Sequence, residues 1–331
     1  MRLTREALVN IANETVQKRV HSGPGLVAAY LTGSLLTDHP FLGNATDIDL
    51  VFVHAREPKL RREIIALTPE VHLDIRHNTR AEYDRPKELR VHPWMGPELY
   101  DPLPLYVTQH FFEFVQAGVR DRYHESASVL ARSQRLATAS RQVWSQIKAS
   151  QATGPELLIF FLSAVQLAAN AIALLTGGPL AERRLLLQLP ARAEAAGAPG
   201  LAAGLNGLIG ANRADKEQLR ALLPEWEKAF LEAARRPQAE VRIAAARLGY
   251  YKLAFQALLE SETPQALVWP MINTWTLAAA ILPAAWKDPW LSACDLLGLD
   301  EAAFNERLEG LDRFLDAIDE LLEKTLASQN L

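Results

Sequence analysis

The sequence predicts an α+β protein in which a mixed sheet flanked by helices comes first and an all-helical bundle follows. Three observations carry this prediction. Short apolar runs alternate with helical spacing up to about residue 122, and all eight histidines lie between His21 and His124. The rest of the chain is dominated by Leu, Ala, Glu and Arg at helical spacing. Because 331 residues exceed the usual span of one core, we predict two domains, 1–122 and 123–331.

The first domain is expected to alternate helices and strands. In chain order the spacing predicts a helix, two strands, a helix, a strand and a further short strand: Thr4–His21, Leu26–Leu31, Ile48–Val53, Pro58–Leu67, Val71–Arg76 and Glu98–Tyr100. From Leu105 onward helical spacing prevails, interrupted by Gly and Pro. The helices show no repeat of fixed period, which favours a bundle over a solenoid.

Charge and cysteine content limit the partners and the compartment. The formal charge of −4 argues against a broad basic surface for nucleic acid, although a local basic groove is compatible with it. The one cysteine, Cys294, cannot form an intramolecular disulfide, and the first residues lack the apolar run of a secretory signal. These features predict a cytoplasmic protein.

The most membrane-like segment is Leu157–Leu175, which approaches the roughly 20 apolar residues that a bilayer requires. Ser163, Gln166 and Asn170 recur within it at offsets of three and four, so its polar groups gather on one helical stripe. This pattern is typical of a core helix, and we expect no membrane span. The apolar helices after residue 155 leave a homodimer as an alternative to a monomer.

Two carboxylates interrupt an apolar strand at Asp47 and Asp49. Strand side chains alternate, so both acids share one face while Ile48, Leu50 and Phe52 share the other, which can pack into the core. Two neighbouring carboxylates repel each other and are costly to bury unless a divalent cation lies between them. Oxygen ligands favour magnesium or manganese at such a position.

Gly33 and Ser34 follow the preceding strand. Glycine lets the backbone approach a ligand closely, and Ser34 offers a hydroxyl and backbone amides where a turn or helix begins. Such a turn is suited to phosphate. A phosphate site beside metal ligands indicates a nucleotide.

Together, the strand, Gly33-Ser34, twelve intervening residues and Asp47-Ile48-Asp49-Leu50 resemble the signature of the polymerase-beta-like nucleotidyltransferase superfamily over residues 26–76. The resemblance implies a third carboxylate on the next strand, for which Asp74 is the best candidate. The length and the helical C-terminal part look like the small-molecule branch, which includes the aminoglycoside nucleotidyltransferases. Leu35, Leu36 and Thr46 depart from the usual residues of the signature.

The resemblance implies a nucleotidyltransferase that moves an NMP from an NTP to a hydroxyl of a small-molecule or protein acceptor and releases pyrophosphate. Asp47, Asp49 and Asp74 would be both catalytic residues and metal ligands, holding two magnesium ions, with manganese as an alternative. The nucleotide would contact Gly33, Ser34 and Thr46, and a Lys or Arg such as Lys252 would reach its phosphates. Residues 123–331 would form the acceptor side of the cleft.

Several residues have alternative interpretations. Glu70, Glu82 and Asp84 are rivals for the third acid, although solvated surface acids explain them better. His72 and Arg76 share the face of Asp74, where they contact substrate or support the structure. A zinc site made of His72, Asp74 and His77 is a weaker alternative, because no cysteine or spaced histidine pair completes it. A basic and aromatic group on one candidate helix, and four tryptophans, have either binding or structural roles: Arg242, Arg247, Tyr250, Tyr251 and Lys252; Trp269, Trp275, Trp286 and Trp290.

Two other functions compete with small-molecule transfer. One is a catalytically silent protein that binds nucleotide or a partner protein, as antitoxin-type relatives are thought to do. The other is a nucleic-acid polymerase or tailing enzyme, which the acidic balance disfavours. The sequence leaves the acceptor and the base preference of the NTP open.

Overall fold

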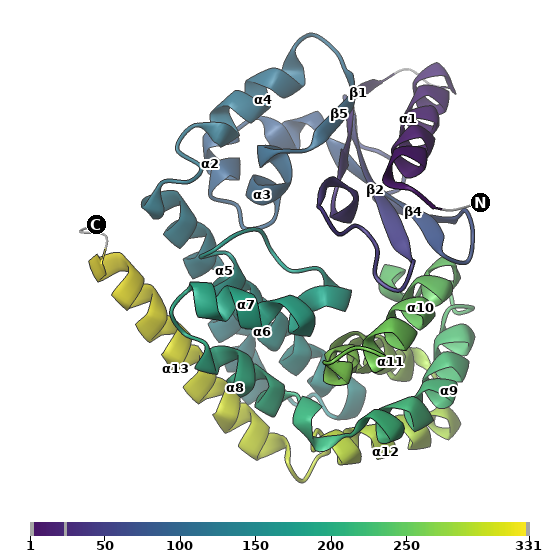
Figure 1. The fold of residues 1–331 in the computed structure, drawn as a ribbon, viewed down its shortest axis with the longest axis vertical. Helices are drawn as coiled ribbons and strands as arrows, with labels where there is room; N and C mark the ends of the chain where they lie inside the picture. The colour runs from purple at the N-terminus through teal and green to yellow at the C-terminus, as the bar shows by residue number, and fades with distance from the viewer. Residues whose placement is uncertain (1–2, 23–24, 329–331) are drawn as a thin grey trace. The chain divides into compact units, whose positions relative to one another are not determined.

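The computed structural model describes residues 3–22 and 25–328, and the chain forms two compact units (Figure 1). Unit 1 comprises Met1–His124 together with Ala246–Ala254, and unit 2 comprises Glu125–Ala245 and Phe255–Leu331. The fold is α+β, as predicted from the sequence, with a sheet in the N-terminal part and helices after it. The segment Ala246–Ala254 comes from the part of the sequence assigned to the bundle, yet it belongs to unit 1.

Unit 1 is built on a five-stranded mixed sheet with the order β3-β4-β2-β1-β5. Strands β2 and β4 are parallel, and the other neighbouring pairs are antiparallel. Its elements in chain order are α1 (Arg5–Ser22), β1 (Leu26–Thr32), η1 (Ser34–Leu36), β2 (Thr46–His54), β3 (Arg62–Ala66), β4 (Val71–Thr79), η2 (Arg80–Tyr83), α2 (Pro86–Arg90), α3 (Met95–Tyr100), β5 (Leu103–Val107) and α4 (Phe111–Arg120).

The two faces of the sheet carry different cores. On one face, Ile48, Leu50 and Phe52 of β2 pack with side chains of α1, as their alternation predicts. On the other face, Val51 and Val53 pack with a cluster from α2, α3 and α4. Asp47 and Asp49 belong by alternation to this second face, before the apolar cluster begins. Figure 1 shows α1 and the group α2 to α4 on different sides of the strands.

Two of the predicted elements are wrong. The expected helix Pro58–Leu67 is instead strand β3, which pairs antiparallel with β4 after a turn at residues 67–71. Pairing along β4 and the β-branched Ile64 and Ile65 outweigh the local helical spacing. The expected strand Glu98–Tyr100 is the end of helix α3, and the fifth strand, β5, follows it at the sheet edge, where Pro104 is tolerated. The helical part therefore starts after β5, not at Leu105.

Unit 2 is helical. Its elements, together with the 3-10 turn and the helix that overlap Ala246–Ala254, are α5 (Ser126–Ala149), α6 (Gly154–Ala173), η3 (Glu182–Arg184), α7 (Leu185–Ala195), α8 (Gly200–Leu208), η4 (Ala211–Arg213), α9 (Lys216–Ala233), η5 (Val241–Ile243), η6 (Ala245–Arg247), α10 (Leu248–Leu259), η7 (Pro264–Leu267), α11 (Val268–Ile281), η8 (Ala284–Trp286), α12 (Asp288–Leu297) and α13 (Phe304–Ser328). Helix α5 packs along α6 and α13, and α11 packs against α6 and α9.

Helix α6 is, among the residues described, the one helix long and apolar enough to cross a membrane. Its apolar window is 61% buried inside the structure, as in the core helix of a soluble protein. The tryptophans are mostly core residues too: Trp269, Trp275 and Trp290 are buried, while Trp286 is partly exposed. The indole of Trp290 donates to Thr276 on α11, which explains this tryptophan by packing and hydrogen bonding rather than by an acceptor pocket.

Candidate functional site

The predicted acids meet on one face of two adjacent strands. In the parallel pair β2–β4, Asp47 lies opposite His72 and Asp49 lies opposite Asp74. Asp47 and Asp74 are 8% and 2% exposed, and Asp49 is partly buried. The parallel register therefore brings together three carboxylates that are far apart in the sequence.

Two arginines hold Asp74. Arg62 of β3 donates from Nε to Oδ1 and from Nη2 to Oδ2, each at 2.7 Å, which is a bidentate pair. Arg247, from Ala246–Ala254, donates from Nη2 to the same Oδ2. The side chain of Arg247 is 6% exposed, whereas that of Arg62 is 37% exposed. A buried positive charge thus already stands beside the acids.

The pKa values of Asp49 and Asp74 are shifted in opposite directions. Burial raises the pKa of Asp49 well above its ordinary value, and the charges of Asp47 and Asp74 raise it further. Burial alone would raise the pKa of Asp74 as well, but the hydrogen bonds from Arg62 and the charges of Arg247 and Arg62 leave it lowered. Asp49 therefore lies beside uncompensated negative charge, whereas Arg62 and Arg247 balance the negative charge of Asp74.

The turn after β1 is shaped around Asp49. Gly33 has φ of 78°, a conformation that L side chains rarely adopt, and a Cβ at this position would overlap Oδ2 of Asp49. The hydroxyl of Thr46 donates to the Pro40 carbonyl at 3.0 Å, so the hydroxyl of Ser34, 3.0 Å from that of Thr46, donates to Thr46. Thr46 is fully buried. Its side chain tethers the loop between β1 and β2 through the Pro40 carbonyl.

We expect Gly33→Ala to lower the free energy of unfolding by more than about 1 kcal/mol, because the backbone is strained and Asp49 must move. The matched control is Gly25→Ala, where φ is 113° but no atom lies within 4 Å of the new Cβ. Urea unfolding of both variants measures the loss. Titration with a divalent ion should show weakened binding for Gly33→Ala alone; equal losses of stability with unchanged ion binding would contradict this role of Gly33.

The chemistry of the donor set fits a metal ion. Within residues 3–22 and 25–328, one group of potential ligands is found: Asp47, His72 and Asp74, whose ligand atoms all lie within 4.8 Å of one another. The guanidinium of Arg247 is a cation, and it pairs with Asp74 at the position that a metal ion would occupy. A cation is therefore what the charges of this face favour, with Asp49 directly opposite Asp74 on the neighbouring strand.

The rival ligands lie elsewhere. His77 is hydrogen-bonded to His54 at 2.9 Å and to Glu63 at 2.7 Å. By alternation its side chain lies on the face of the sheet opposite Asp74. The alternative zinc site of His72, Asp74 and His77 is therefore wrong. Glu82 accepts from the Thr79 amide, where it caps a short 3-10 turn. Glu82 and Asp84 are exposed and Glu70 is partly exposed, which agrees with surface acids.

The basic and aromatic group of residues 242–252 is not on one helix. Arg242 lies on η5 in unit 2, where it pairs with Glu240. Arg247 precedes α10 and reaches Asp74, and Lys252 is partly buried farther along α10. Glycine 249 packs directly on the carbonyl oxygen of Pro69, and the backbone of Leu253 packs on Gly43. These close contacts seat the segment on unit 1.

Sequence reasoning missed Arg62 as a site residue. The Thr68-Pro69-Glu70 turn is the signal that could have revealed Arg62, because it predicts a hairpin between residues 62–66 and β4. In that hairpin, alternation places Arg62 on the same face as Asp74. Arg76, predicted to share this face, donates to Glu98, which also accepts from Tyr30 at 2.7 Å. Burial lowers the pKa of Arg76, but the charge of Glu98, and to a smaller extent that of the nearby Asp49, leave it raised.

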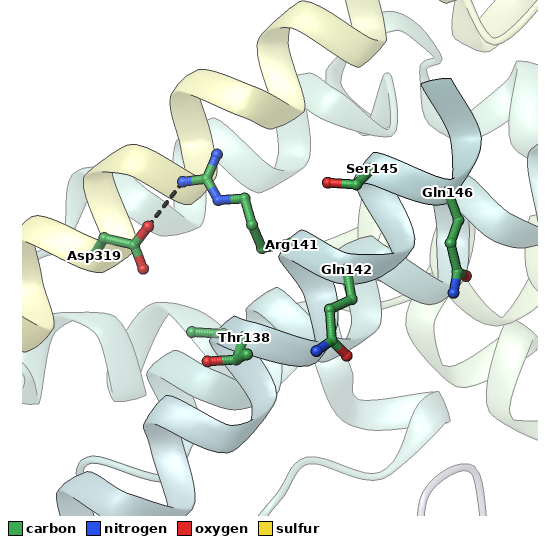
Figure 2. Close-up of a pocket in the computed structure, with 7 residues that line it drawn as sticks. Thr138, Arg141, Gln142, Ser145, Gln146 and Asp319 are labelled. Atoms are coloured by element: carbon green, nitrogen blue, oxygen red, sulfur yellow. Dashed lines mark hydrogen bonds and ion pairs between the residues drawn. The ribbon is translucent and has the colours of Figure 1, made fainter. Parts of the chain in front are cut away.

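Unit 2 has a separate hollow of about 440 Å³ between α5 and α13 (Figure 2). Arg141 lines it and donates to Asp312, Asp316 and Asp319 of α13 at 2.7 to 2.8 Å. The remaining lining residues that Figure 2 labels are small or polar: Thr138, Gln142, Ser145 and Gln146. Because carboxylates already neutralise the cation in this hollow, it has no excess positive charge for a phosphate.

Comparison with known proteins adds little to this geometry. No family model matches the chain, and no curated protein matches it. A solved structure of a nucleotidyltransferase-like protein from Exiguobacterium sibiricum is similar over 94% of this chain and 91% of that chain, with 11% identity and a TM-score of 0.29. A likeness of this degree says nothing about reaction or substrate, so the function has to be inferred from the residues of the acidic face.

Proposed function

We propose that this protein is a metal-dependent nucleotidyltransferase that moves an NMP from an NTP to a hydroxyl of a small-molecule acceptor. The observation that carries the proposal is the convergence of Asp47, Asp49 and Asp74 on one face, beside a Gly33-Ser34 turn in contact with Asp49. The raised pKa of Asp49 supports it, because burial and then the charges of Asp47 and Asp74 disfavour its ionised form, and a bound cation would relieve this cost.

Each part of the face has a task in this reaction. Asp47 and Asp49 would hold the cation, and the turn at Gly33 would present backbone amides to the triphosphate. Arg247 supplies the positive charge that was expected from the helical part of the chain, and it lies beside the acids where phosphates would bind. Divalent ions bound here, which we expect to be two magnesium ions or manganese, would supply Lewis acidity for the acceptor hydroxyl and for the departing pyrophosphate.

A silent nucleotide-binding protein is the second candidate. The observation in its favour is that both oxygens of Asp74 accept from arginines, which reduces the charge that Asp74 can offer to an ion. Such a protein would bind nucleotide without turning it over. In both cases we expect a cytoplasmic protein with no nucleic-acid partner, and a homodimer remains an alternative to a monomer.

Calorimetric titration with a non-hydrolysable NTP analogue tests the proposal. We expect micromolar or tighter binding in the presence of magnesium and a loss of at least tenfold without it, because the triphosphate would bind partly through the ion. A pyrophosphate-release assay with hydroxyl-bearing acceptors then separates the two candidates. Binding without release for any acceptor class favours the silent protein, and no binding of ATP, GTP, CTP or UTP analogues would exclude both.

A further inference from the structure

We infer that His72 is a direct ligand of the metal ion and that the site consequently binds first-row transition ions more tightly than magnesium. This inference rests on the metal site of the proposed function, and it concerns which ion binds there rather than which acceptor is used. The ligand atoms of His72, Asp47 and Asp74 lie within 4.8 Å of one another, a spacing that one ion can bridge.

The backbone fixes this grouping. His72 lies directly opposite Asp47 in the parallel pair β2–β4 and two residues before Asp74, so all three side chains share one face. All three residues are almost fully buried: His72 is 0% exposed, Asp47 8% and Asp74 2%. A buried set of this kind offers an ion protein ligands in place of much of its water.

The imidazole is also held in place from outside the sheet. The ring of Tyr250 meets the ring of His72 edge-on, with centroids 4.9 Å apart and planes at 82°. Tyr250 follows Gly249, whose backbone packs on the Pro69 carbonyl, so the ring that supports His72 is itself anchored. A ligand held by packing in this way is oriented before the ion arrives.

The donor set decides the ion. Carboxylates and water suit magnesium, whereas imidazole nitrogen suits zinc, iron, nickel and related transition ions. Magnesium also demands near-ideal octahedral oxygen geometry and releases water reluctantly. A site of two carboxylates and one imidazole should therefore favour the transition ion. The competing interpretation is that His72 interacts with the two carboxylates only electrostatically, so that oxygen ligands alone determine which ion binds.

Titration calorimetry with Co²⁺ and with Mg²⁺ separates these interpretations. We expect the wild-type protein to bind Co²⁺ at least about ten times more tightly than Mg²⁺. We expect His72→Asn to lose at least about tenfold in Co²⁺ affinity, with a smaller change for Mg²⁺. His77→Asn is the matched control, because it removes a buried histidine from the same strand but from the opposite face, and its Co²⁺ affinity should match the wild type.

A measurement on the wild type keeps the test independent of how the variants fold. Ligation by His72 should give the Co²⁺ complex a hyperfine-shifted, exchangeable ring N–H proton in its NMR spectrum. Absence of that signal, or equal affinity for the two ions, would overturn the inference. If nucleotide analogue still bound with magnesium, the proposed function would stand without His72. If no divalent ion bound at all, the inference and the metal-dependent function would both be wrong.

Discussion

Asp47→Asn and Asp49→Asn are each expected to lower NTP-dependent transfer by at least about a hundredfold, the usual cost of removing a charge aimed at the reacting phosphate. Both changes keep the size of the side chain, so the fold should persist. Pyrophosphate release, measured at saturating NTP and acceptor, checks the loss. Glu70→Gln is the matched control, since it removes one carboxylate just before β4 without touching the acidic face, and it should retain full activity.

Asp49→Asn is also expected to stabilise the metal-free protein at neutral pH. The pKa of Asp49 is raised in the folded state, chiefly by burial and then by Asp47 and Asp74. Stability from such a group is fully present below its ordinary pKa near 3.8 and is lost as pH rises through the folded pKa. The advantage of the Asn variant should therefore grow with pH across that window.

Urea unfolding of the wild type and of Asp49→Asn at about pH 4 and about pH 8 measures this effect. We expect the urea midpoints of Asp49→Asn and of the wild type to differ more at the higher pH. Together with lost transfer, this result would show that Asp49 serves function at the expense of stability. If Asp49→Asn were less stable than the wild type at both pH values, Asp49 would be a structural residue. Near-normal turnover in either Asn variant would remove the proposed mechanism.

The parts of the site that could be predicted from the sequence are those with local signals. The two-residue period of a strand placed Asp47 and Asp49 on one face and Ile48, Leu50 and Phe52 in the core. The alternation of apolar and polar residues over Val71–Arg76 likewise placed Asp74 on a strand. Those signals need only a few neighbouring residues, and the parallel pairing of β2 with β4 then aligned Asp49 with Asp74.

The partners of Asp74 could not be predicted from local pattern. Arg62 lay in a stretch interpreted as a helix, because β3 is stabilised by pairing with β4 and not by its own spacing. Arg247 lies 173 residues from Asp74, and its approach depends on how the chain returns to unit 1. Thr46 shows a third limit, since its role as a loop tether follows from hydrogen bonds that sequence does not reveal.

The second large effect is expected at Asp74. Asp74→Asn removes the carboxylate that pairs directly with Arg247, whose side chain is 6% exposed. Breaking a buried ion pair from one side typically costs about 3–5 kcal/mol, because the remaining charge stays buried without compensation. We therefore expect a loss of this size in the free energy of unfolding, measured in urea. Arg62 should contribute less to the loss because water reaches its side chain.

A double-mutant cycle with Arg247→Met identifies the cause. If the loss comes from the uncompensated guanidinium, Asp74→Asn combined with Arg247→Met should be more stable than Asp74→Asn alone. Asp101→Asn is the control, because Asp101 forms an exposed pair with Arg120 and should cost no more than about 1 kcal/mol. Should Asp74→Asn unfold like the wild type, the ion pair would not be what holds Arg247 on unit 1.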